Sequence, residues 1–159
     1  MSGITNVLRE LSLREKHILR FKKTHPDAIT PTRGTEFSAG MDLYSTDEYL
    51  IDSECSKMVD TGIAAEIHEG YVGLLNIRSS LGAKRNLRLA NCQGIIDSDY
   101  RGSIQCAIYN DSVEPAIIHK GDKIAQLVVA PYLYLDPIEV DELDETVRGK
   151  GGFGSTGER

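Results

Sequence analysis

One short stretch of the chain, GIIDSDYRG from Gly94 to Gly102, holds two acids, a tyrosine and an arginine between two glycines. As a loop between strands, it would anchor Ile95 and Ile96 on apolar surface and place Asp97 in the turn. A carboxylate held against apolar neighbours, as Asp97 would be, is desolvated, which raises its basicity. Tyr100 would then form one wall of a small cavity. The alternative, a turn-capping acid followed by a tyrosine at the end of a core strand, stays open on this segment alone.

Two further segments carry side chains that suit anions. In IRSSL, Arg78 precedes Ser79 and Ser80, so a planar cation and two hydroxyl donors follow the end of one strand. In GDKIAQLVV, Gln126 is a polar residue within the apolar run IAQLVV, and such an amide should hydrogen-bond to a specific partner. Arg78, Ser79 and Ser80 therefore predict a phosphate cradle, whereas the residues alone leave the partner of Gln126 open.

The closing stretch RGKGGFGSTGER, residues 148–159, has five glycines in its first ten residues and little that could pack a core. Backbone N–H groups freed by glycine can converge on an anion, and Arg148, Ser155 and Thr156 add donors. Phe153 could stack on a flat ligand such as a nucleobase. The alternative is a disordered terminus with an incidental phenylalanine. The GxGxxG spacing lacks a following helix, and Ser155 stands where a Walker A loop requires lysine, so neither nucleotide fingerprint applies.

These segments must be positioned by a single domain, because 159 residues are too few for two domains of ordinary size. The chain has 24 acids and 18 bases, and its formal net charge of −6 would repel a phosphate backbone. We therefore expect no nucleic-acid partner, and any anionic ligand must be held by a local site.

The cysteines and histidines do not form a metal-binding pattern. Cys55, Cys92 and Cys106 include no CxxC pair, and an odd number cannot all pair within one chain. Reduced thiols in an intracellular compartment, cytoplasmic or nuclear, are the simplest interpretation. The four histidines have no spacing that would place two on one face, so no metal ligands are expected from protein side chains.

No apolar run approaches the roughly 20 residues that span a bilayer, so we expect no membrane partner. The opening residues 1–17 lack the apolar stretch of a secretory signal and carry basic and apolar residues at helical spacing. They are expected to form an N-terminal extension with a short amphipathic helix.

Beyond residue 17 the pattern is that of an all-β domain, expected over residues 18–147, in which short apolar runs alternate with Gly, Pro, Asn and Asp. In SIQCAIY, Ile104, Cys106 and Ile108 recur at every second position, as in a half-buried strand. A two-sheet jelly roll or distorted β-barrel would bury so many short strands. The expected strands lie in ILRFKK, MDLYS, KMVDTGIAAEI, YVGLLNIR, SIQCAIYN, PAIIHK and KIAQLVVAPYLY.

Taken together and in this order, the segments resemble the five motifs of the dUTP diphosphatase (dUTPase) family. The five are AGMDLYS, RSSL, GIIDSDYRG, GDKIAQLVV and RGKGGFGSTG, and they span nearly the whole chain. One such motif would be weak support, whereas five in register are specific. FKKTHPDAITPTRGTEFSAG is also similar to the usual start of that domain.

The resemblance implies a homotrimer of jelly-roll subunits whose three active sites are each assembled from all three chains. It implies Mg²⁺-dependent hydrolysis of dUTP to dUMP and pyrophosphate, which keeps uracil out of DNA and supplies dUMP for thymidylate synthesis. Asp97 would orient and deprotonate the water that attacks the α-phosphate. The metal would be bound mainly through substrate phosphates and water.

Binding roles carry over by motif position in the same way. Tyr100 would lie under the deoxyribose and leave no room for a 2′-hydroxyl. The uracil edge would pair with the Asn91 side chain and with backbone of the hairpin from Asn91 to Tyr100, including Gly94, Ile95 and Ile96. The phosphates would be held by Arg78, Ser79, Ser80 and Gln126, with Asp42 supporting the site. From the flexible C-terminal arm, residues 148–159, the groups that close over the nucleotide would be Arg148, Phe153, Gly154, Ser155 and Thr156.

One position departs from the family pattern. Arg85 and Asn86 stand where many relatives have His-Gly. Asparagine is the next best residue for a left-handed turn, so we expect the bend to survive.

Two other functions are alternatives to the diphosphatase. A dCTP deaminase-like enzyme of the same fold would release ammonia from dCTP, and the intact GFGSTG segment favours the diphosphatase over it. A nucleotide-gated protein-interaction module would not need a catalytic base. Retention of Asp97, Tyr100 and Phe153 together argues against such a silent module.

Overall fold

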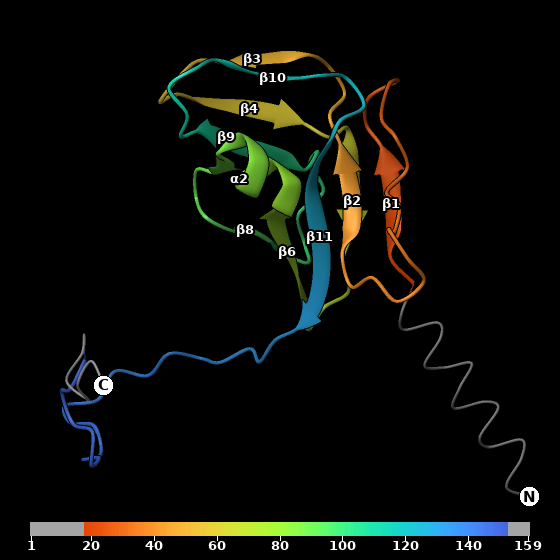
Figure 1. Ribbon diagram of the computed structural model, residues 1–159. Helices are drawn as coiled ribbons and strands as arrows, with labels where there is room; N and C mark the ends of the chain where they lie inside the picture. Colours follow the sequence, from red (N-terminus) through yellow and green to blue (C-terminus); the bar gives the residue numbers. More distant parts are fainter. Residues whose placement is uncertain (1–17, 153–159) are drawn as a thin grey trace, which may run out of the picture.

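The structure is a computed structural model, and it describes residues 18–152 (Figure 1). Within this range the chain forms short strands and the short helix α2, Ser79–Arg85. The strands are β1 Arg20–Lys23, β2 Met41–Tyr44, β3 Tyr49–Ile51, β4 Ser56–Asp60, β5 Ile63–Glu66, β6 Tyr71–Ile77, β7 Leu87–Leu89, β8 Gly94–Ile96, β9 Gln105–Asn110, β10 Ala116–Ile118 and β11 Lys123–Pro131. The prediction of an all-β, jelly-roll type of subunit is confirmed. The N-terminal extension, residues 1–17, lies outside the described residues.

The strands pair in antiparallel fashion into two larger and two smaller sheets. The four-stranded sheet has the order β2-β11-β6-β8, and the three-stranded sheet has the order β4-β9-β7. Two-stranded pairs, β1-β5 and β10-β3, complete the fold. In Figure 1, β4 crosses the direction of β2 and β11 at a steep angle. Since β8 is an edge strand, residues that follow it face open space.

The core lies between the sheets and is built by alternation along each strand. In β9, Cys106, Ile108 and Asn110 are buried while the residues between them are more exposed. In the four-stranded sheet, Leu43 and Leu127 point into the same core. Such burial of aliphatic side chains is the main favourable term in folding.

The predicted strand KMVDTGIAAEI is in fact two strands, β4 and β5. The break falls at Gly62, which has a φ of +63°. A Cβ added there would lie 2.8 Å from atoms of His25, Ala28 and Thr46, so the close approach of the chain also requires glycine. The prediction of one continuous strand was wrong because a left-handed residue cannot continue a pleated ladder.

Strand β11 contains a β-bulge at its start. Lys123 pairs with Tyr44 and Ala125 pairs with Leu43, so one extra residue, Ile124, is inserted on β11. Ile124 and Ala125 are consecutive and both fully buried, which strict alternation would forbid. The insertion shifts the phase of the strand by one residue, so Lys123 and Gln126 emerge on the same side of the sheet.

The fully buried Asn110 ties two chain segments to the end of β9. Its Nδ2 donates to the carbonyl oxygens of Ile51 (3.0 Å) and Glu114 (2.8 Å). Its Oδ1 accepts hydrogen bonds from the backbone N–H (3.0 Å) and the hydroxyl (2.6 Å) of Ser112. Every polar atom of this buried amide therefore has a partner, as burial demands.

Helix α2 ends at Asn86, which has a φ of +51° and donates its N–H to the carbonyl of Leu81. The expectation that asparagine preserves the left-handed turn at this position is confirmed.

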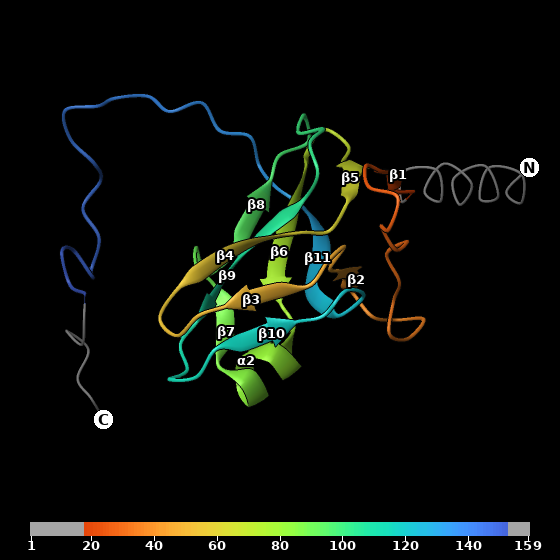
Figure 2. The same cartoon turned by 90° about the horizontal axis from the view of Figure 1, so that it is seen from above.

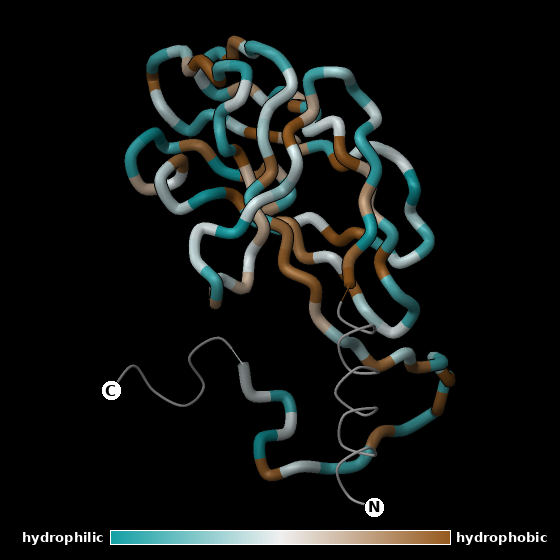
Figure 3. The backbone as a smooth tube through the Cα atoms, turned by 90° about the vertical axis from the view of Figure 1, so that its right-hand side faces the viewer, coloured by the Kyte–Doolittle hydropathy of each residue, from teal (hydrophilic) through white to brown (hydrophobic). Residues whose placement is uncertain are grey.

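Residues 132–147 follow β11 as an extended segment without helix or strand (Figure 1). The Tyr132 N–H donates to the Gly70 carbonyl (3.0 Å), and beyond this bond the segment is exposed. Figure 3 shows hydrophobic residues recurring along it. The exposed apolar side chains are Leu133, Tyr134, Leu135, Ile138, Val140, Leu143 and Val147. This part of the chain has no core of its own, although the sequence placed it within the β-domain.

Candidate functional site

The segment GIIDSDYRG begins as strand β8 rather than as a loop. Gly94, Ile95 and Ile96 pair with β6, and the buried Gly94 packs so closely that an added Cβ would lie 3.0 Å from Leu75 Cβ. Ile95 is 57% exposed, so the expectation that it anchors the segment to apolar surface was wrong. Ile95 points outward because strand residues alternate between the two faces of the sheet, and its face is the exposed one in β8.

Asp97 directly follows β8 and is exposed. It lines an open groove of about 980 Å³ together with Ser98, Tyr71, His68 and Tyr132, among others. The expectation that apolar neighbours desolvate this carboxylate is not met in the single chain, because β8 is the edge of its sheet.

The turn after Asp97 is held by hydrogen bonds from its own residues. The Tyr100 N–H donates to the Asp97 carbonyl (3.2 Å). Arg101 Nη1 donates to the carbonyl oxygens of Ser98 (2.6 Å) and Tyr100 (2.9 Å). The arginine of this motif therefore fixes the backbone that carries Asp97 and Tyr100.

The second glycine of the motif makes room for Tyr100. The Tyr100 hydroxyl donates to the Ser103 carbonyl (3.0 Å), and Ser103 Oγ donates in turn to Asp60. A Cβ at Gly102 would collide with the Tyr100 hydroxyl and lie 2.7 Å from its Cζ. The two glycines thus do different jobs: Gly94 lets β8 approach β6, and Gly102 lets the tyrosine ring lie over the backbone.

Asn91 is exposed at the turn between β7 and β8. Its carbonyl accepts a hydrogen bond from the Gln93 N–H (2.7 Å), and Gln93 Nε2 donates to Asn76 Oδ1 (2.7 Å) on β6. The predicted Asn91–Tyr100 hairpin is therefore attached to the four-stranded sheet at both β8 and Gln93.

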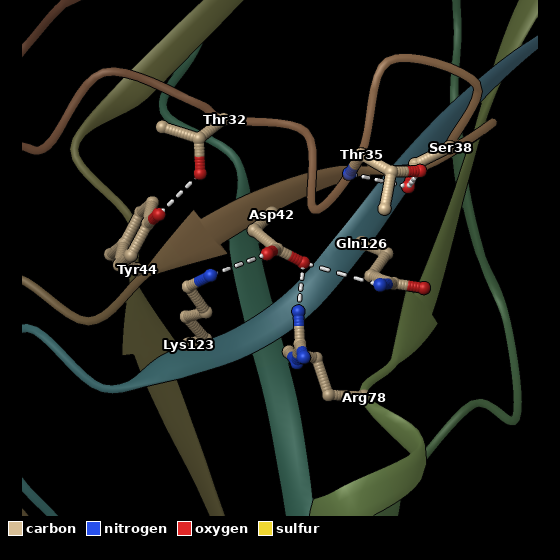
Figure 4. Close-up of polar contacts among 8 residues, drawn as sticks. All are labelled: Thr32, Thr35, Ser38, Asp42, Tyr44, Arg78, Lys123 and Gln126. Atoms are coloured by element: carbon tan, nitrogen blue, oxygen red, sulfur yellow. Dashed lines mark hydrogen bonds and ion pairs between the residues drawn. The ribbon is translucent and has the colours of Figure 1, made fainter.

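A second cluster is built around Asp42 on β2 (Figure 4). The Asp42 side chain is only 1% exposed, yet it contacts three donors. Its Oδ1 accepts hydrogen bonds from Arg78 Nη1 and from Gln126 Nε2 (3.2 Å), and its Oδ2 lies 2.9 Å from Lys123 Nζ. Gln126, expected to bond a specific partner, has one in Asp42.

The carboxylate and the cations of this cluster stabilise each other's charged forms. Burial acts to raise the pKa of Asp42, but the hydrogen bonds from Lys123, Gln126 and Arg78 outweigh it, and the pKa lies below its ordinary value of 3.8. The same contact with Asp42 raises the pKa of Lys123. Asp42 is thus ionised and paired at neutral pH, and its contribution to stability is lost as pH falls through its lowered pKa.

The remaining predicted phosphate-binding residues lie beside this cluster. Arg78 follows β6 and occupies the N-cap position of α2 without a side-chain capping bond, and Ser79 and Ser80 are exposed in the first turn of that helix. Gly40 allows Gln126 to pack against the chain before β2, since an added Cβ would lie 3.1 Å from Gln126 Cβ. Lys123 was missed by the sequence analysis. The segment KIAQ contained a signal for this lysine, because two consecutive apolar residues separate Lys123 from Gln126. A β-bulge between the two polar residues would place both side chains on the same face of the sheet.

The two clusters lie at opposite ends of β6 in one chain. Asp97 follows Ile96, which pairs with Gly73 near the start of β6, whereas Arg78 follows the last residue of β6. Five to six residues of strand therefore separate the position of Asp97 along β6 from that of Arg78, a distance of about 17 to 20 Å. Figure 2 shows α2 beyond the arrowhead of β6 and the arrowhead of β8 at the other end. Asp97 and Arg78 of one chain therefore do not face a common phosphate.

The described part of the arm makes only local contacts of its own. Arg148 Nε donates to the Gly151 carbonyl (2.9 Å), and the Gly149 N–H donates to Thr146 Oγ1 (3.1 Å). The predicted binding residues Phe153, Gly154, Ser155 and Thr156 lie outside the described residues.

The fold and its two polar clusters define a class: an all-β protein with an exposed carboxylate after the edge strand β8 and a cluster of cations and an amide around Asp42 at the other end of β6. A family model described as dUTPase matches residues 26–157. The chain belongs to the dUTPase family.

Individual relatives agree with this assignment. Deoxyuridine 5′-triphosphate nucleotidohydrolase of Escherichia phage T5 is 45% identical over 150 residues, covering 89% of this chain and 100% of that protein. The enzyme of the same name from Nautilia profundicola is 43% identical over 139 residues, covering 87% and 98%.

Solved structures of phage enzymes share the fold. A mutant dUTPase of Staphylococcus bacteriophage 80alpha with dUpNHpp superimposes with a TM-score of 0.83 at 28% identity, covering 89% of this chain and 99% of that one. A mutant dUTPase from phage phi11 of S. aureus, described with a structural Mg(II) ion, gives 0.76 at 26% identity, covering 81% and 100%.

Proposed function

We propose that this member of the dUTPase family hydrolyses dUTP to dUMP and pyrophosphate in a Mg²⁺-dependent reaction. The proposal is supported by family membership over residues 26–157 and by relatives named for the same activity. The observation that carries its detail is the separation of Asp97 from the Asp42–Arg78 cluster by the length of β6.

That separation supports a homotrimer with active sites shared between subunits. A reacting phosphate must lie within hydrogen-bonding reach of both its base-bound water and its binding groups, which one chain does not offer. A neighbouring copy can bring its own Arg78 end to the Asp97 edge. Exposed apolar side chains at Ile95 and along residues 132–147 are further surface that an assembly would bury.

In the proposed mechanism Asp97 orients the attacking water and accepts its proton. The carboxylate is exposed on a braced turn, so it can meet both substrate and a partner chain. General-base assistance is typically worth about 10² to 10⁴ in rate, and positioning together with charge neutralisation supplies the rest.

Nucleoside recognition is assigned to the same hairpin. Tyr100, fixed through Ser103, would lie under the deoxyribose and leave no space for a 2′-hydroxyl. The Asn91 side chain and the backbone of β8 would pair with the uracil edge. Asn91 is exposed, and Ile95 of β8 lines the groove, which suits contact with a nucleotide.

Phosphate binding is assigned to Arg78, Ser79, Ser80 and Gln126, with Asp42 holding two of them in place. The C-terminal arm would then cover the nucleotide through Arg148, Phe153, Gly154, Ser155 and Thr156. Arg148 is free to exchange its local bond for a phosphate, because its partner is an exposed carbonyl of the arm itself.

In this proposal the metal is carried mainly by substrate phosphates and water. Within residues 18–152, no three His, Cys, Asp or Glu side chains gather into a metal-binding group. Mg²⁺ usually keeps several waters and binds substrate phosphates, so we assign its ligands to the phosphates of dUTP and to water, and to no protein side chain. When bound, the ion would neutralise charge on the phosphates.

The proposed activity is tested by pyrophosphate release from dUTP, UTP, dTTP and dCTP, with and without Mg²⁺. Of the four nucleotides, we expect only dUTP to be hydrolysed. Omitting Mg²⁺ should abolish this hydrolysis. Ammonia release from dCTP would instead support the deaminase alternative.

Replacing Gly102 with alanine should displace Tyr100 and weaken discrimination against UTP about tenfold. The new methyl group would occupy the space of the Tyr100 hydroxyl. The ratio of kcat/KM for dUTP and UTP measures this. Gly34→Ala is the matched control, because its nearest heavy atom would be 3.6 Å away. Unchanged selectivity in Gly102→Ala would contradict the role given to Tyr100.

Mixing two inactive variants should restore activity if sites are shared. Asp97→Asn chains keep Arg78, and Arg78→Gln chains keep Asp97, so a trimer containing both can form intact sites. When equal amounts are co-refolded, about a quarter of the sites should be intact. Each variant refolded alone is the control. Activity no greater than the sum of the two separate variants would refute sites built from two chains.

A further inference from the structure

The bulge in β11 brings a second cation to Asp42. Without the extra residue Ile124, Lys123 and Gln126 would point to opposite faces of the sheet, because they are three positions apart. With it, both reach the same buried carboxylate, Lys123 at Oδ2 and Gln126 at Oδ1 (Figure 4). Bulges commonly re-aim a side chain next to an active site.

The second cation changes what Arg78 can do. A carboxylate and one arginine tend to form a bidentate pair whose charges cancel. Here Lys123 occupies Oδ2, so Arg78 bonds only Oδ1 and shares that oxygen with Gln126. One carboxylate faces two cations, and the cluster keeps a net charge of +1. The Arg78 and Lys123 side chains are 26% and 43% exposed, so this charge is accessible to a ligand.

We propose that Lys123 is a positioning residue for polyphosphate binding: by taking the second oxygen of Asp42, it keeps the Arg78 fork directed at the nucleotide phosphates. This inference rests on the proposed function, since it deepens the phosphate site of that reaction. Oδ2 of Asp42 is buried and accepts no hydrogen bond from the described residues, so the Lys123 ammonium at 2.9 Å is the charge that compensates it. Loss of Lys123 would remove this compensation, and Arg78 would turn to bond both oxygens of Asp42.

The test compares K123Q, K123R and K120Q with the unaltered chain. Lys120 is the matched control, because its Nζ also pairs with an aspartate, Asp27, at 2.8 Å, but away from Asp42. Steady-state kinetics with dUTP and calorimetric binding of dUpNHpp and of dUMP are measured for each. In K123Q we expect KM for dUTP and Kd for dUpNHpp to rise about tenfold, with kcat changed less than about threefold.

Three measurements distinguish a role of the Lys123 charge in positioning from a purely structural role of its side chain. K123R should restore triphosphate binding to within about threefold of the unaltered chain, because it keeps the cation. In K123Q, dUMP binding should change far less than dUpNHpp binding, since fewer phosphate charges are involved. K120Q should behave as the unaltered chain does.

The proposal is overturned if K123Q binds dUpNHpp normally, if K123R is as impaired as K123Q, or if K123Q weakens dUMP and dUpNHpp equally. Failure of the unaltered chain to hydrolyse dUTP would refute the proposed function instead. The two failures are therefore distinguishable.

Discussion

Replacing Asp97 with asparagine should lower kcat for dUTP about 10²- to 10⁴-fold while leaving affinity for dUpNHpp within about threefold. The substitution keeps the shape of the side chain but removes the carboxylate that accepts a proton from water. The braced turn around Asp97 depends on backbone acceptors and Arg101, so the loop should keep its conformation. Single-turnover hydrolysis and calorimetric binding measure the two quantities separately.

Asp99→Asn is the matched control for this experiment. Asp99 lies two residues further along the same exposed turn and lines the same groove. Asp99→Asn should retain turnover close to that of the unaltered chain. It removes the same charge as Asp97→Asn does, but at a position that is not assigned to the attacking water. Substantial turnover by Asp97→Asn, or equal loss in both variants, would show that Asp97 is not the base.

Replacing Asn110 with alanine should lower the free energy of unfolding by about 3 to 5 kcal/mol. The change removes a fully buried amide and leaves the carbonyls of Ile51 and Glu114 without this donor. It also leaves a small cavity at the end of β9. Urea unfolding followed by circular dichroism gives the value, with chain concentration held constant because assembly contributes to apparent stability.

Ser112→Ala serves as the comparison. It removes the hydroxyl that donates to Asn110 but leaves the amide in place to serve the other two segments. We expect a loss of about 1 kcal/mol. If the free energies of unfolding of Asn110→Ala and Ser112→Ala differ by less than about 1 kcal/mol, Asn110 does not hold the segments together as its contacts indicate.

Most of the scaffold followed from local patterns in the sequence. Alternation in SIQCAIYN predicted β9, and the left-handed bend at Asn86 was expected, although the helix α2 that it ends was not. Of the strands with three residues, β10 lies in the predicted apolar run PAIIHK, whereas β3, β7 and β8 were not predicted because three residues show no measurable period. They exist because their neighbours in the sheets supply hydrogen-bond partners distant in the chain.

The candidate site was predicted as a set of residues but not as an arrangement. The motifs named Asp42, Arg78 and Gln126 without revealing that the first is the buried acceptor for the other two. Those contacts join β2, β6 and β11, and they depend on pairing register and a bulge rather than on sequence distance. The exposure of Asp97 could not be foreseen either, because it follows from the edge position of β8.

The buried position of Cys106 makes the chain convenient to label. Burial, with a smaller contribution from the charge of Asp60, raises the pKa of the Cys106 thiol to about 12, so the reactive thiolate is scarce at neutral pH. Cys55 and Cys92 are exposed. After Cys55→Ser, a maleimide dye should therefore attach at Cys92 alone, in the turn assigned to uracil, where its fluorescence would report nucleotide arrival directly.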